Sequence, residues 1–340
     1  MNHDRHNYAE TLLYTLIIII IISGCAQPEE KPLPLIMRIG HPMAPGNNVT
    51  LGYEKFKEVV EKKSQGKIQI KIYPNTLIGN DVVTMKAAQK GELEMASSST
   101  PNMAELSKKF MAFDLPYITY PQHKQRFYEA VDKGELRQYL ENISADIGLK
   151  PIMWSEYGYR NFANTRKLIR TPKDIEGLTI RVTQSPVDLA VTAAAGAKAV
   201  TLIWADTYPA LVRGTIDGEG NTFSLLYSAK HHEALRYVAT TQHNYSMHVL
   251  MMNKRYWDGL PREVQSIIQE SAQEALAYER KITNELEESA KTALNKAGVQ
   301  VVDLTPAERE QWIKATRPVW NKFRSEIPQE LVKLIQNTQR

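Results

Sequence analysis

Strand-like and helix-like segments alternate near the start of the chain, and this alternation constrains the fold more than any other feature. The clearest strand is at residues 67–73, where Ile68, Ile70 and Ile72 share one face and Lys or Gln residues occupy the other. Helical spacing of apolar residues precedes and follows that strand. The five expected segments are strands at 35–40, 67–73 and 93–96 and helices through 53–60 and 81–90. This β-α-β-α-β order predicts a parallel sheet covered by helices.

The same alternation restarts in the second half of the chain. The expected strands are residues 149–154, 179–182, 237–241 and 248–252, and the expected helices are 187–195 and 206–213. The strands at 237–241 and 248–252 are candidates to cross between lobes. An α/β fold of two lobes joined by hinge strands, a periplasmic-binding-protein-like clamshell, is therefore expected. In such folds a ligand lies in the crevice at the carboxyl ends of the strands.

A long, charge-rich helix is expected toward the C-terminus and would cross both lobes. It covers residues 261–296, with Pro261 in its first turn and Gly298 just past its end. Another helix should begin at Pro306 and break near Pro318. The resulting lobe prediction assigns residues 35–158 with 247–286 to lobe 1, and 159–246 with 287–340 to lobe 2.

The first residues predict export from the cytoplasm. Residues 12–22 form an apolar run of eleven residues, whereas a helix needs about 20 to cross a hydrocarbon core of roughly 30 Å. The run suits the central region of a signal peptide. Residues 22–25 (ISGC) resemble a bacterial lipobox, which implies cleavage after residue 24 and a lipid on the Cys25 sulfur. Cys25 is the single cysteine of the chain, so it has no disulfide partner within it.

The segment 1–24 is thus expected to be a lipoprotein signal peptide, and the Pro-rich residues 25–34 an extended tether. The alternatives are an uncleaved N-terminal membrane anchor and simple secretion. Each of these readings places the body of the protein outside the cytoplasm.

Composition and motifs argue against several other functions. The chain has 340 residues, 43% of them hydrophobic, and a net charge of +4 without a dense Lys/Arg cluster, so nucleic-acid binding has little support. The GxSxG, HExxH, P-loop, GxGxxG and CxxC signatures are absent. The eight His residues are scattered, which does not favour a metal site. An enzyme is therefore not expected, and neither is a metal or another cofactor.

One arginine has the chemistry of a binding residue. In the strand 179–182, alternation puts Ile180 and Val182 on one face and Arg181 on the other. The guanidinium group is a planar fork that can bind a carboxylate through two parallel hydrogen bonds. On periodicity alone, a carboxylate clamp and a surface or ion-paired arginine are equally open.

Several short motifs, in a fixed order from about residue 36 to 300, make the chain recognisable. They are residues 63–68 (KSQGKI), 73–74 (YP), Gly79, 113–117 (FDLPY), 158–160 (GYR), 177–182 (GLTIRV), 208–211 (YPAL) and 216–221 (IDGEGN). Together they resemble the DctP-type solute-binding proteins of tripartite ATP-independent periplasmic (TRAP) transporters.

The resemblance implies roles for four residues. Arg181 falls on the arginine that grips the ligand carboxylate, and Asn221 on the asparagine that supports the same carboxylate. Arg160 falls on a second basic residue of the site. Trp204 falls where relatives place an aromatic ring against the ligand. The structural alternatives are that Trp204 belongs to the hydrophobic core and that Arg160 forms an ion pair with an acid at the hinge.

Three further pocket positions follow from the resemblance. Asn80 and Ser99 fall on polar pocket positions of sialic-acid-binding relatives, and His41 is a weaker candidate. Asn80 could instead cap the helix that starts near residue 81, and Ser99 could be a simple loop hydroxyl. Residues 97–100 lack the acidic group that reads an amine in some relatives, which favours a hydroxylated or plain carboxylate. Gly220 departs from the sequence of a metal-dependent subgroup, so no metal is expected.

The implied function is capture of a small organic acid, such as a C4-dicarboxylate or sugar acid, by lobe closure. The expected partners are the integral membrane subunits of the transporter and, through lipid on Cys25, the membrane. The expected state is a monomer in the periplasm or on the outer face of the cytoplasmic membrane. The alternatives are a receptor for a signalling partner, a secreted enzyme and an ABC-type binding protein.

Overall fold

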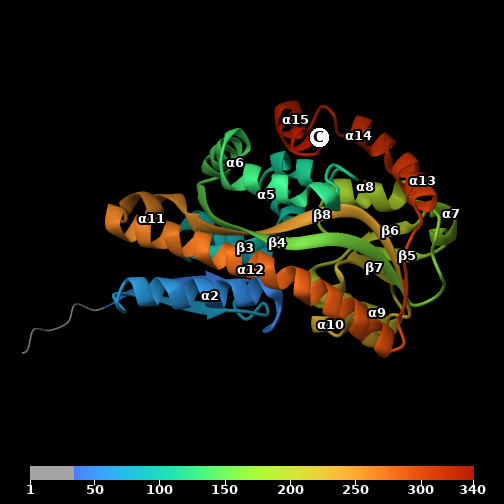
Figure 1. The fold of residues 1–340 in the computed structure, drawn as a ribbon, viewed down its shortest axis with the longest axis horizontal. Coiled ribbons are helices and arrows are strands. Elements are labelled where there is room, and N and C mark those ends of the chain that lie inside the picture. Colours follow the sequence, from blue (N-terminus) through green and yellow to red (C-terminus); the bar gives the residue numbers. More distant parts are fainter. Residues whose placement is uncertain (1–33) are drawn as a thin grey trace, which may run out of the picture. The chain divides into compact units, whose positions relative to one another are not determined.

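The computed structural model describes residues 34–340. The predicted signal peptide, the lipid on Cys25 and all of the tether except Pro34 lie outside the described residues. The chain then enters the predicted β-α-β-α-β unit (Figure 1). Its elements are β1 (Leu35–Gly40), α2 (Asn48–Lys63), β2 (Ile68–Tyr73), α3 (Asp81–Lys90) and β3 (Met95–Ser99). Strand β1 pairs in parallel with both β2 and β3, which confirms the predicted arrangement.

Two long antiparallel strands, β4 (Leu149–Asn164) and β8 (Tyr237–Asn253), run side by side through the middle of the sheet (Figure 1). The prediction of two separate strands at 237–241 and 248–252 is wrong, because both belong to β8. The pairing of β4 with β8 shifts register three times, once between Glu156 and Gly158. Such bulges bend and twist strands locally.

The second half of the sheet contains β5 (Thr179–Val182), β6 (Lys198–Thr201) and β7 (Gly218–Asn221). Strand β7 pairs antiparallel with β4, and β5 pairs in parallel with β6 and β7. The sheet order is β2-β1-β3-β8-β4-β7-β5-β6, and β9 (Gln300–Val302) pairs with β8. Strands β4 and β8 therefore join a β1–β3 half to a β5–β7 half.

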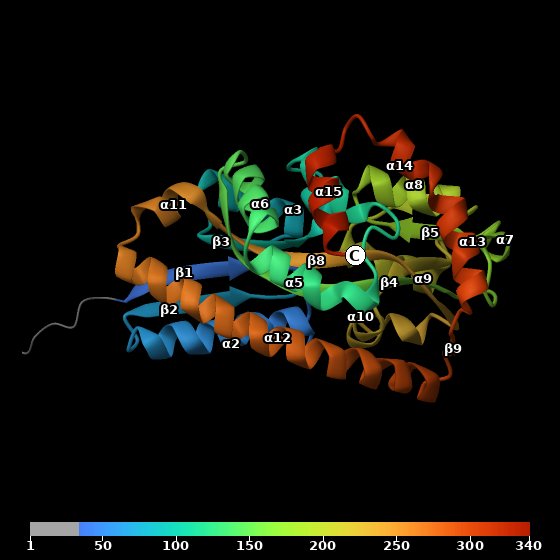
Figure 2. The same cartoon turned by 45° about the horizontal axis from the view of Figure 1, so that its top comes forward.

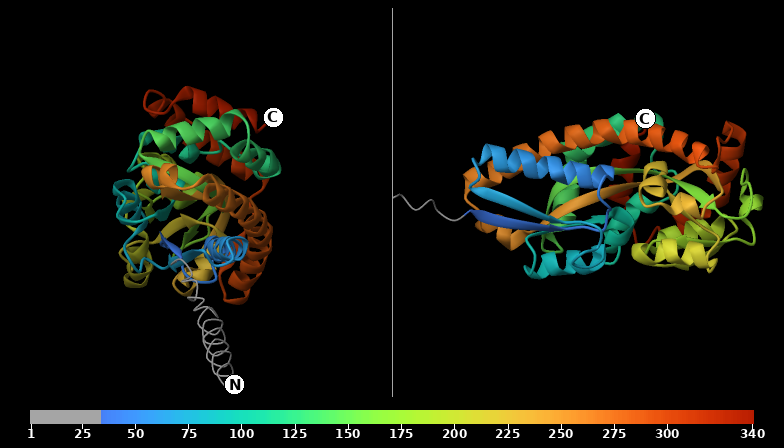
Figure 3. Two further views of the ribbon diagram at one scale, coloured as in Figure 1. Left: turned by 90° about the vertical axis from the view of Figure 1, so that its left-hand side faces the viewer. Right: turned by 90° about the horizontal axis from the view of Figure 1, so that it is seen from below.

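Helix α12 (Arg262–Lys296) is 35 residues long and confirms the predicted long helix. It lies beside α2, contacts β4 and reaches α10 (Phe223–Ser228), so it follows both halves of the sheet (Figures 2 and 3). The predicted break at Pro318 is confirmed, since α13 (Pro306–Thr316) ends just before it and α14 (Pro318–Lys322) starts there. The last helix, α15 (Gln329–Asn337), packs against α6 (Glu135–Ala145). The exact lobe boundaries stay a prediction.

The remaining short elements connect these parts. They are α4 (Thr100–Met103), η1 (Lys108–Asp114), η2 (Pro121–His123), α5 (Lys124–Asp132), α7 (Pro172–Ile175), α8 (Pro186–Ala194), α9 (Trp204–Arg213), η3 (His231–Glu233) and α11 (Lys254–Gly259). Residues Leu35–Arg340 form one compact unit. Within residues 34–340, no helix combines the length and apolar character needed to span a membrane.

Hydrophobic clusters cover both faces of the sheet. One lies between the sheet and helices α5, α6 and α15, and it includes Phe113, Phe127 and Leu331. Another fills the space between the sheet, α2 and α12, and it includes Tyr53 and Phe56. The second of these clusters includes residues of β1, β2 and β3, whereas Ile180 of β5 belongs to a further cluster with Phe162 and Trp312.

Candidate functional site

Arg181 lies within β5, and its side chain is only 4% exposed. Its Nε and Nη2 atoms both donate hydrogen bonds to the Leu202 carbonyl oxygen, at 3.0 and 2.9 Å. The guanidinium carbon lies 5.9 Å from the centre of the Trp204 ring. Burial lowers the pKa of Arg181 from its ordinary value. The two bonds to one carbonyl fix the plane of the guanidinium group, so the fork is oriented by the protein itself.

A buried carboxylate balances part of this charge. Glu219 is the β7 residue paired with Arg181 in the sheet, and it has no exposed surface. Its carboxylate hydrogen-bonds with Nδ1 of His231 and accepts from Nδ2 of Asn221 at 2.8 Å. Burial alone would raise the pKa of Glu219, but His231, Arg181 and Asn221 hold it below its ordinary value. Glu219 is therefore an ionised partner for Arg181.

Trp204 is the first residue of α9, directly after the loop that follows β6. Its ring stacks on His231 with centroids 4.7 Å apart. Trp204 is half-buried and lines a cavity of about 370 Å³ together with Asn75, Tyr208 and His231. The ring therefore connects the Arg181 region with an accessible cavity and is not a fully buried core residue.

Arg160, in β4, is 2% exposed. Its Nε donates to the Ser246 hydroxyl at 2.9 Å, and its Nη1 donates to the Gly220 carbonyl at 2.8 Å. Its guanidinium carbon lies 4.9 Å from the centre of the Tyr157 ring. The observed partners are a hydroxyl and a carbonyl, not an acid that ties the hinge.

The predicted quartet thus lies close together in the β4–β7 part of the sheet. Its members are Arg181, Asn221, Arg160 and Trp204. The contacts that join them are the Glu219 bond to Asn221, the Arg160 bond to Gly220 and the contact of Trp204 with Arg181. The predicted quartet therefore occupies one place, although its members come from four different elements.

The other three predicted residues lie at the β1–β3 half. Asn80 caps α3, since its side chain accepts a hydrogen bond from the Val83 N–H at 2.9 Å. Ser99 ends β3 and is 5% exposed. His41 follows β1, has no exposed surface, and neither ring nitrogen finds a partner among the described residues. Burial lowers the pKa of His41 to about 4, so the ring is neutral at pH 7.

Aromatic and histidine rings link the two groups. His41 meets Tyr53 edge-to-face at 5.3 Å between ring centroids, and the Tyr53 hydroxyl lies 3.4 Å from Nδ1 of His248. His248 pairs with Ser99 in the sheet and stacks on Tyr157 at 5.9 Å. Tyr157 in turn lies against Arg160. A continuous row of rings therefore leads from His41 to the arginines.

Two buried acids also face the arginines. Asp81 accepts hydrogen bonds from Asn102 at 2.5 Å and from Ser98 at 3.1 Å, and it is close enough to Arg181 to feel its charge. Both carboxyl oxygens of Asp114 are buried without a partner among the described residues. Burial raises the pKa of Asp114 to about 7, and the charge of Asp188 adds to this effect. The nearby Ser185 hydroxyl and then Arg160 oppose it. Cations that suit a carboxylate and acceptors that suit hydroxyl groups thus lie close together in this part of the fold.

The sequence arguments missed Glu219, His231, Tyr157, His248, Asp81 and Asp114. Glu219 lies within the motif at 216–221 and Tyr157 lies beside the motif at 158–160, so their positions next to recognised motifs could have identified them. His231 and His248 gave none, because their contacts depend on elements far apart in the sequence. No group of three or more His, Cys, Asp or Glu side chains in residues 34–340 is placed to hold a metal ion.

Comparison with known proteins agrees with this geometry. Residues 39–326 match the family described as bacterial extracellular solute-binding protein, family 7, or DctP. The 2,3-diketo-L-gulonate-binding periplasmic protein YiaO of Escherichia coli (strain K12) is 28% identical over 325 residues, which cover 94% of this chain and 97% of that protein.

Solved structures of similar proteins share the fold. The sugar-acid-binding protein of Advenella mimigardefordensis, in complex with galactonate, has a TM-score of 0.85 and 28% identity, and the match covers 90% of this chain and 98% of that one. A TRAP periplasmic solute-binding protein of Shewanella oneidensis, with bound succinate, has a TM-score of 0.84 and 25% identity, with 90% and 100% covered. The predicted α/β binding-protein fold is therefore confirmed. The chain belongs to the DctP family, bacterial extracellular solute-binding protein family 7, and is a TRAP-type periplasmic solute-binding protein rather than an enzyme.

Proposed function

We propose that this chain captures a small organic acid, with Arg181 as the carboxylate clamp, and delivers it to the membrane subunits of a TRAP transporter. The observation that carries the proposal is the geometry of Arg181, which is 4% exposed and held in one plane by the Leu202 carbonyl. A charge-assisted hydrogen bond to such a preoriented fork stabilises the complex by about 1.5–3 kcal/mol net. Asn221 supports the same carboxylate in this proposal.

The ligand class follows from the rest of the crevice. Arg160 and Arg181 supply two cations, which suits a carboxylate with a second acidic or strongly polar end. The Asp114 oxygens and the His41 nitrogens have no hydrogen-bond partner within residues 34–340, and they suit hydroxyl groups because a buried polar atom without a partner is costly. A hydroxylated acid of the sugar-acid type satisfies both requirements, and a C4-dicarboxylate satisfies the first. Relatives that bind galactonate and succinate are consistent with this choice.

The proposed cycle is a conformational one. The acid binds in the open crevice, the two halves close around it by hinge motion at β4 and β8, and water leaves. Arg160, Trp204, Ser99, Asn80 and His41 then complete the pocket wall. Closure presents a changed surface to the membrane subunits, which take up the released solute.

Calorimetric titration of the mature protein with galactonate and succinate tests the clamp. Arg181→Ala should abolish measurable binding of whichever acid binds the wild type, and Arg181→Lys should bind poorly because Lys cannot present the fork. Arg166→Ala is the matched control, since Arg166 is an exposed arginine whose ion pair with Asp217 lies at the surface. A near-normal affinity of Arg181→Ala for that acid would contradict the role of Arg181 as the carboxylate clamp.

The finer proposal on location is that Cys25 carries lipid and tethers the body outside the cytoplasmic membrane. Its support is the ISGC sequence after the apolar run, together with the single cysteine. Growth of an expressing strain with an alkyne-labelled fatty acid should label the wild type but not Cys25→Ser. Equal labelling of both proteins would contradict the anchor. A monomeric state remains part of the proposal, and sedimentation of the mature protein tests it.

A further inference from the structure

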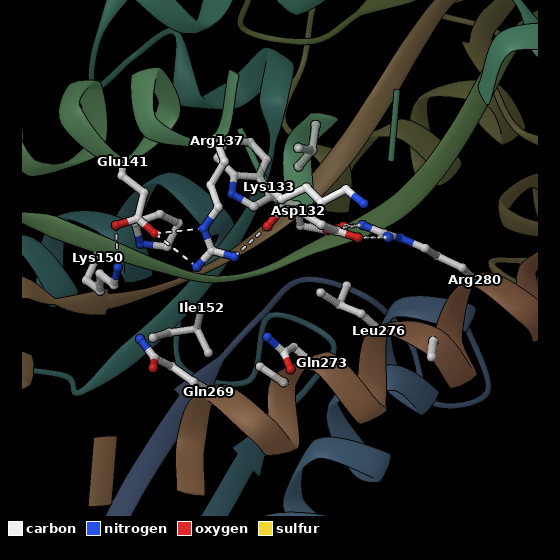
Figure 4. Close-up of a pocket in the computed structure, with 15 residues that line it drawn as sticks. Asp132, Lys133, Arg137, Glu141, Lys150, Ile152, Gln269, Gln273, Leu276 and Arg280 are labelled. Carbon is white, nitrogen blue, oxygen red and sulfur yellow. Dashed lines mark hydrogen bonds and ion pairs between the residues drawn. The ribbon is translucent and has the colours of Figure 1, made fainter. Parts of the chain in front are cut away.

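A second cavity lies apart from the Arg181 crevice. It has a volume of about 450 Å³ and is formed by the end of α5, helix α6, the start of β4 and the middle of α12 (Figure 4). None of the predicted pocket residues lines it. Its volume lies within the range of roughly 300–1,000 Å³ that is usual for small-molecule sites.

One wall of this cavity is rich in positive charge. Lys133, Arg137, Lys150 and Arg280 line it, against only two acids, Asp132 and Glu141. Figure 4 shows Lys150, Arg137 and Arg280 spread along this wall. The lining therefore carries two more positive than negative charges.

Part of this excess of positive charge lies beside Glu141. Arg137 donates to Glu141 through Nε at 3.3 Å and Nη2 at 3.1 Å, and Nζ of Lys150 hydrogen-bonds to the other carboxylate oxygen. Two cations thus share one carboxylate. The Lys150 side chain is 15% exposed, so water screens its charge only in part. A second carboxylate beside Arg137 and Lys150 would make the charges equal.

The far end of the same wall has further donors. Arg280 pairs with Asp132 through Nη1 and Nη2 at 2.5 and 2.9 Å, while its buried Nε has no partner among the described residues. Lys133 makes no ion pair within residues 34–340. The wall therefore keeps more cations than acids although three of its cations are ion-paired.

The opposite wall is apolar with two amides. Ile152 of β4 and Leu276 of α12 face the cations in Figure 4. Gln269 and Gln273, both on α12, lie beside them. The apolar lining also includes Trp154, Ala272, Val131, Pro151 and Ala277. Such a surface suits the hydrocarbon body of a ligand, whereas the cations suit its acidic group.

We propose that this cavity is a second, independent binding site for a small carboxylate with an apolar body. The carboxylate would lie between Arg137 and Lys150, and the apolar body would lie against Ile152 and Leu276. The site differs in kind from the Arg181 crevice, because its apolar wall favours a hydrophobic acid over a polyhydroxylated one. Benzoate is the probe of choice, and benzyl alcohol is its uncharged counterpart of similar shape.

The test is titration of the mature protein with both probes, followed by NMR of the ¹⁵N-labelled tryptophan indole groups. Trp154 lines the cavity, so its indole signal reports on binding there. Benzoate should shift the Trp154 signal saturably, with benzyl alcohol at least about tenfold weaker because it lacks the charge-assisted bonds. The response should persist in Arg181→Ala, which separates this site from the crevice. It should weaken at least about tenfold in Arg137→Gln and in Lys150→Met.

Glu141→Gln gives a prediction of the opposite sign. Removing its charge leaves Arg137 and Lys150 uncompensated, so benzoate should bind more tightly than to the wild type. Lys108→Met is the control, because Lys108 is an exposed lysine paired with Glu326 elsewhere on the surface. The proposal is overturned if Arg137→Gln and Lys150→Met leave the benzoate affinity unchanged, or if Glu141→Gln weakens it. Loss of the response in Arg181→Ala would likewise assign benzoate to the crevice.

Discussion

At the scale of single residues, the surroundings of Arg181 depend on a cation and an anion that are both removed from water. Arg181 and Glu219 are neighbours across β5 and β7, and Glu219 also hydrogen-bonds His231 and Asn221. Breaking such a buried network by removing one partner is more costly than its net contribution would suggest, because the other polar groups stay buried. Glu219 thus supports the clamp without needing to touch a ligand.

We therefore predict that Glu219→Ala lowers the free energy of unfolding by about 3–5 kcal/mol. The control is Glu233→Ala, in which an exposed carboxylate bonded to the Tyr208 hydroxyl is lost, and it should change stability by less than about 0.5 kcal/mol. Urea unfolding followed by circular dichroism measures both. Equal stability of the two variants would show that the buried network carries no special weight.

The sequence allowed the quartet around Arg181 to be placed together because each member lies in or near a recognised motif. It did not reveal Glu219 and His231 as partners. Their contact joins β7 to η3, and no local spacing or periodicity encodes a contact between a strand and a later turn. It also left Asn80 open between a helix cap and the pocket wall. The structure shows the cap, and the pocket role stays a prediction.

At the scale of elements, the sequence predicted α12 well and β8 poorly. Helix α12 has a periodic charge pattern with Pro261 before it and Gly298 after it, and these signals are local. The sequence pattern predicts two strands in place of β8, because residues 242–247 are mostly polar. Those polar residues are buried at the crossing and bonded there, as when Ser246 accepts from Arg160 and Asn244 donates to the Asp114 carbonyl. Tertiary contacts thus replace the hydrophobic alternation that a strand prediction needs.

Helix α12 carries a buried carboxyl at the level of the β4 bulge. Glu279 has no exposed surface, and it accepts hydrogen bonds from the Glu156 N–H at 3.1 Å and from Asn48 at 2.8 Å. Gly52 of α2 lies so close that an added Cβ would be 2.8 Å from the Glu279 side chain. Burial, followed by the charge of Glu156, raises the pKa of Glu279 to about 8. The Glu156 carboxylate is itself paired with Lys124 of α5.

This pKa gives a pH dependence with a definite sign. Between the ordinary pKa near 4.5 and the folded value near 8, the folded state holds a proton that the unfolded state has lost. The contribution of Glu279 to stability is therefore full below about pH 4.5 and is lost as the pH rises through 8, at up to about 1.4 kcal/mol per pH unit. Urea unfolding at pH 5, 6.5 and 8 should show a smaller decline for Glu279→Gln than for the wild type. Parallel declines would refute the assignment.

At the scale of the whole folded unit, the last helix packs against a helix from the first half of the chain. Helix α15 packs on α6, and Leu331 and Ile335 belong to the hydrophobic cluster that also contains Phe113 and Phe127. The sequence gives no sign of this contact, because an amphipathic helix shows that it has a partner but not which one. The overall two-halved architecture was predictable, since alternation and crossover rules leave few arrangements.

We predict that Leu331→Ala lowers the free energy of unfolding by about 2–5 kcal/mol, because Leu331 has no exposed surface and its loss leaves a cavity. Lys333→Ala, at an exposed position of the same helix, should change it by less than about 0.5 kcal/mol. Thermal or urea unfolding compares the two. Similar effects would mean that α15 contributes little to the folded unit.

The pairing of β3 with β8 has a consequence for the order of synthesis. Met95 lies beside Met252 in the sheet, and helix α2 meets α12 only after residue 262 has been made. A chain that emerges N-terminus first therefore carries an incomplete β1–β3 half until most of it has left the ribosome. Contacts between such distant residues form slowly. The topology itself thus delays completion of the β1–β3 half until late in synthesis.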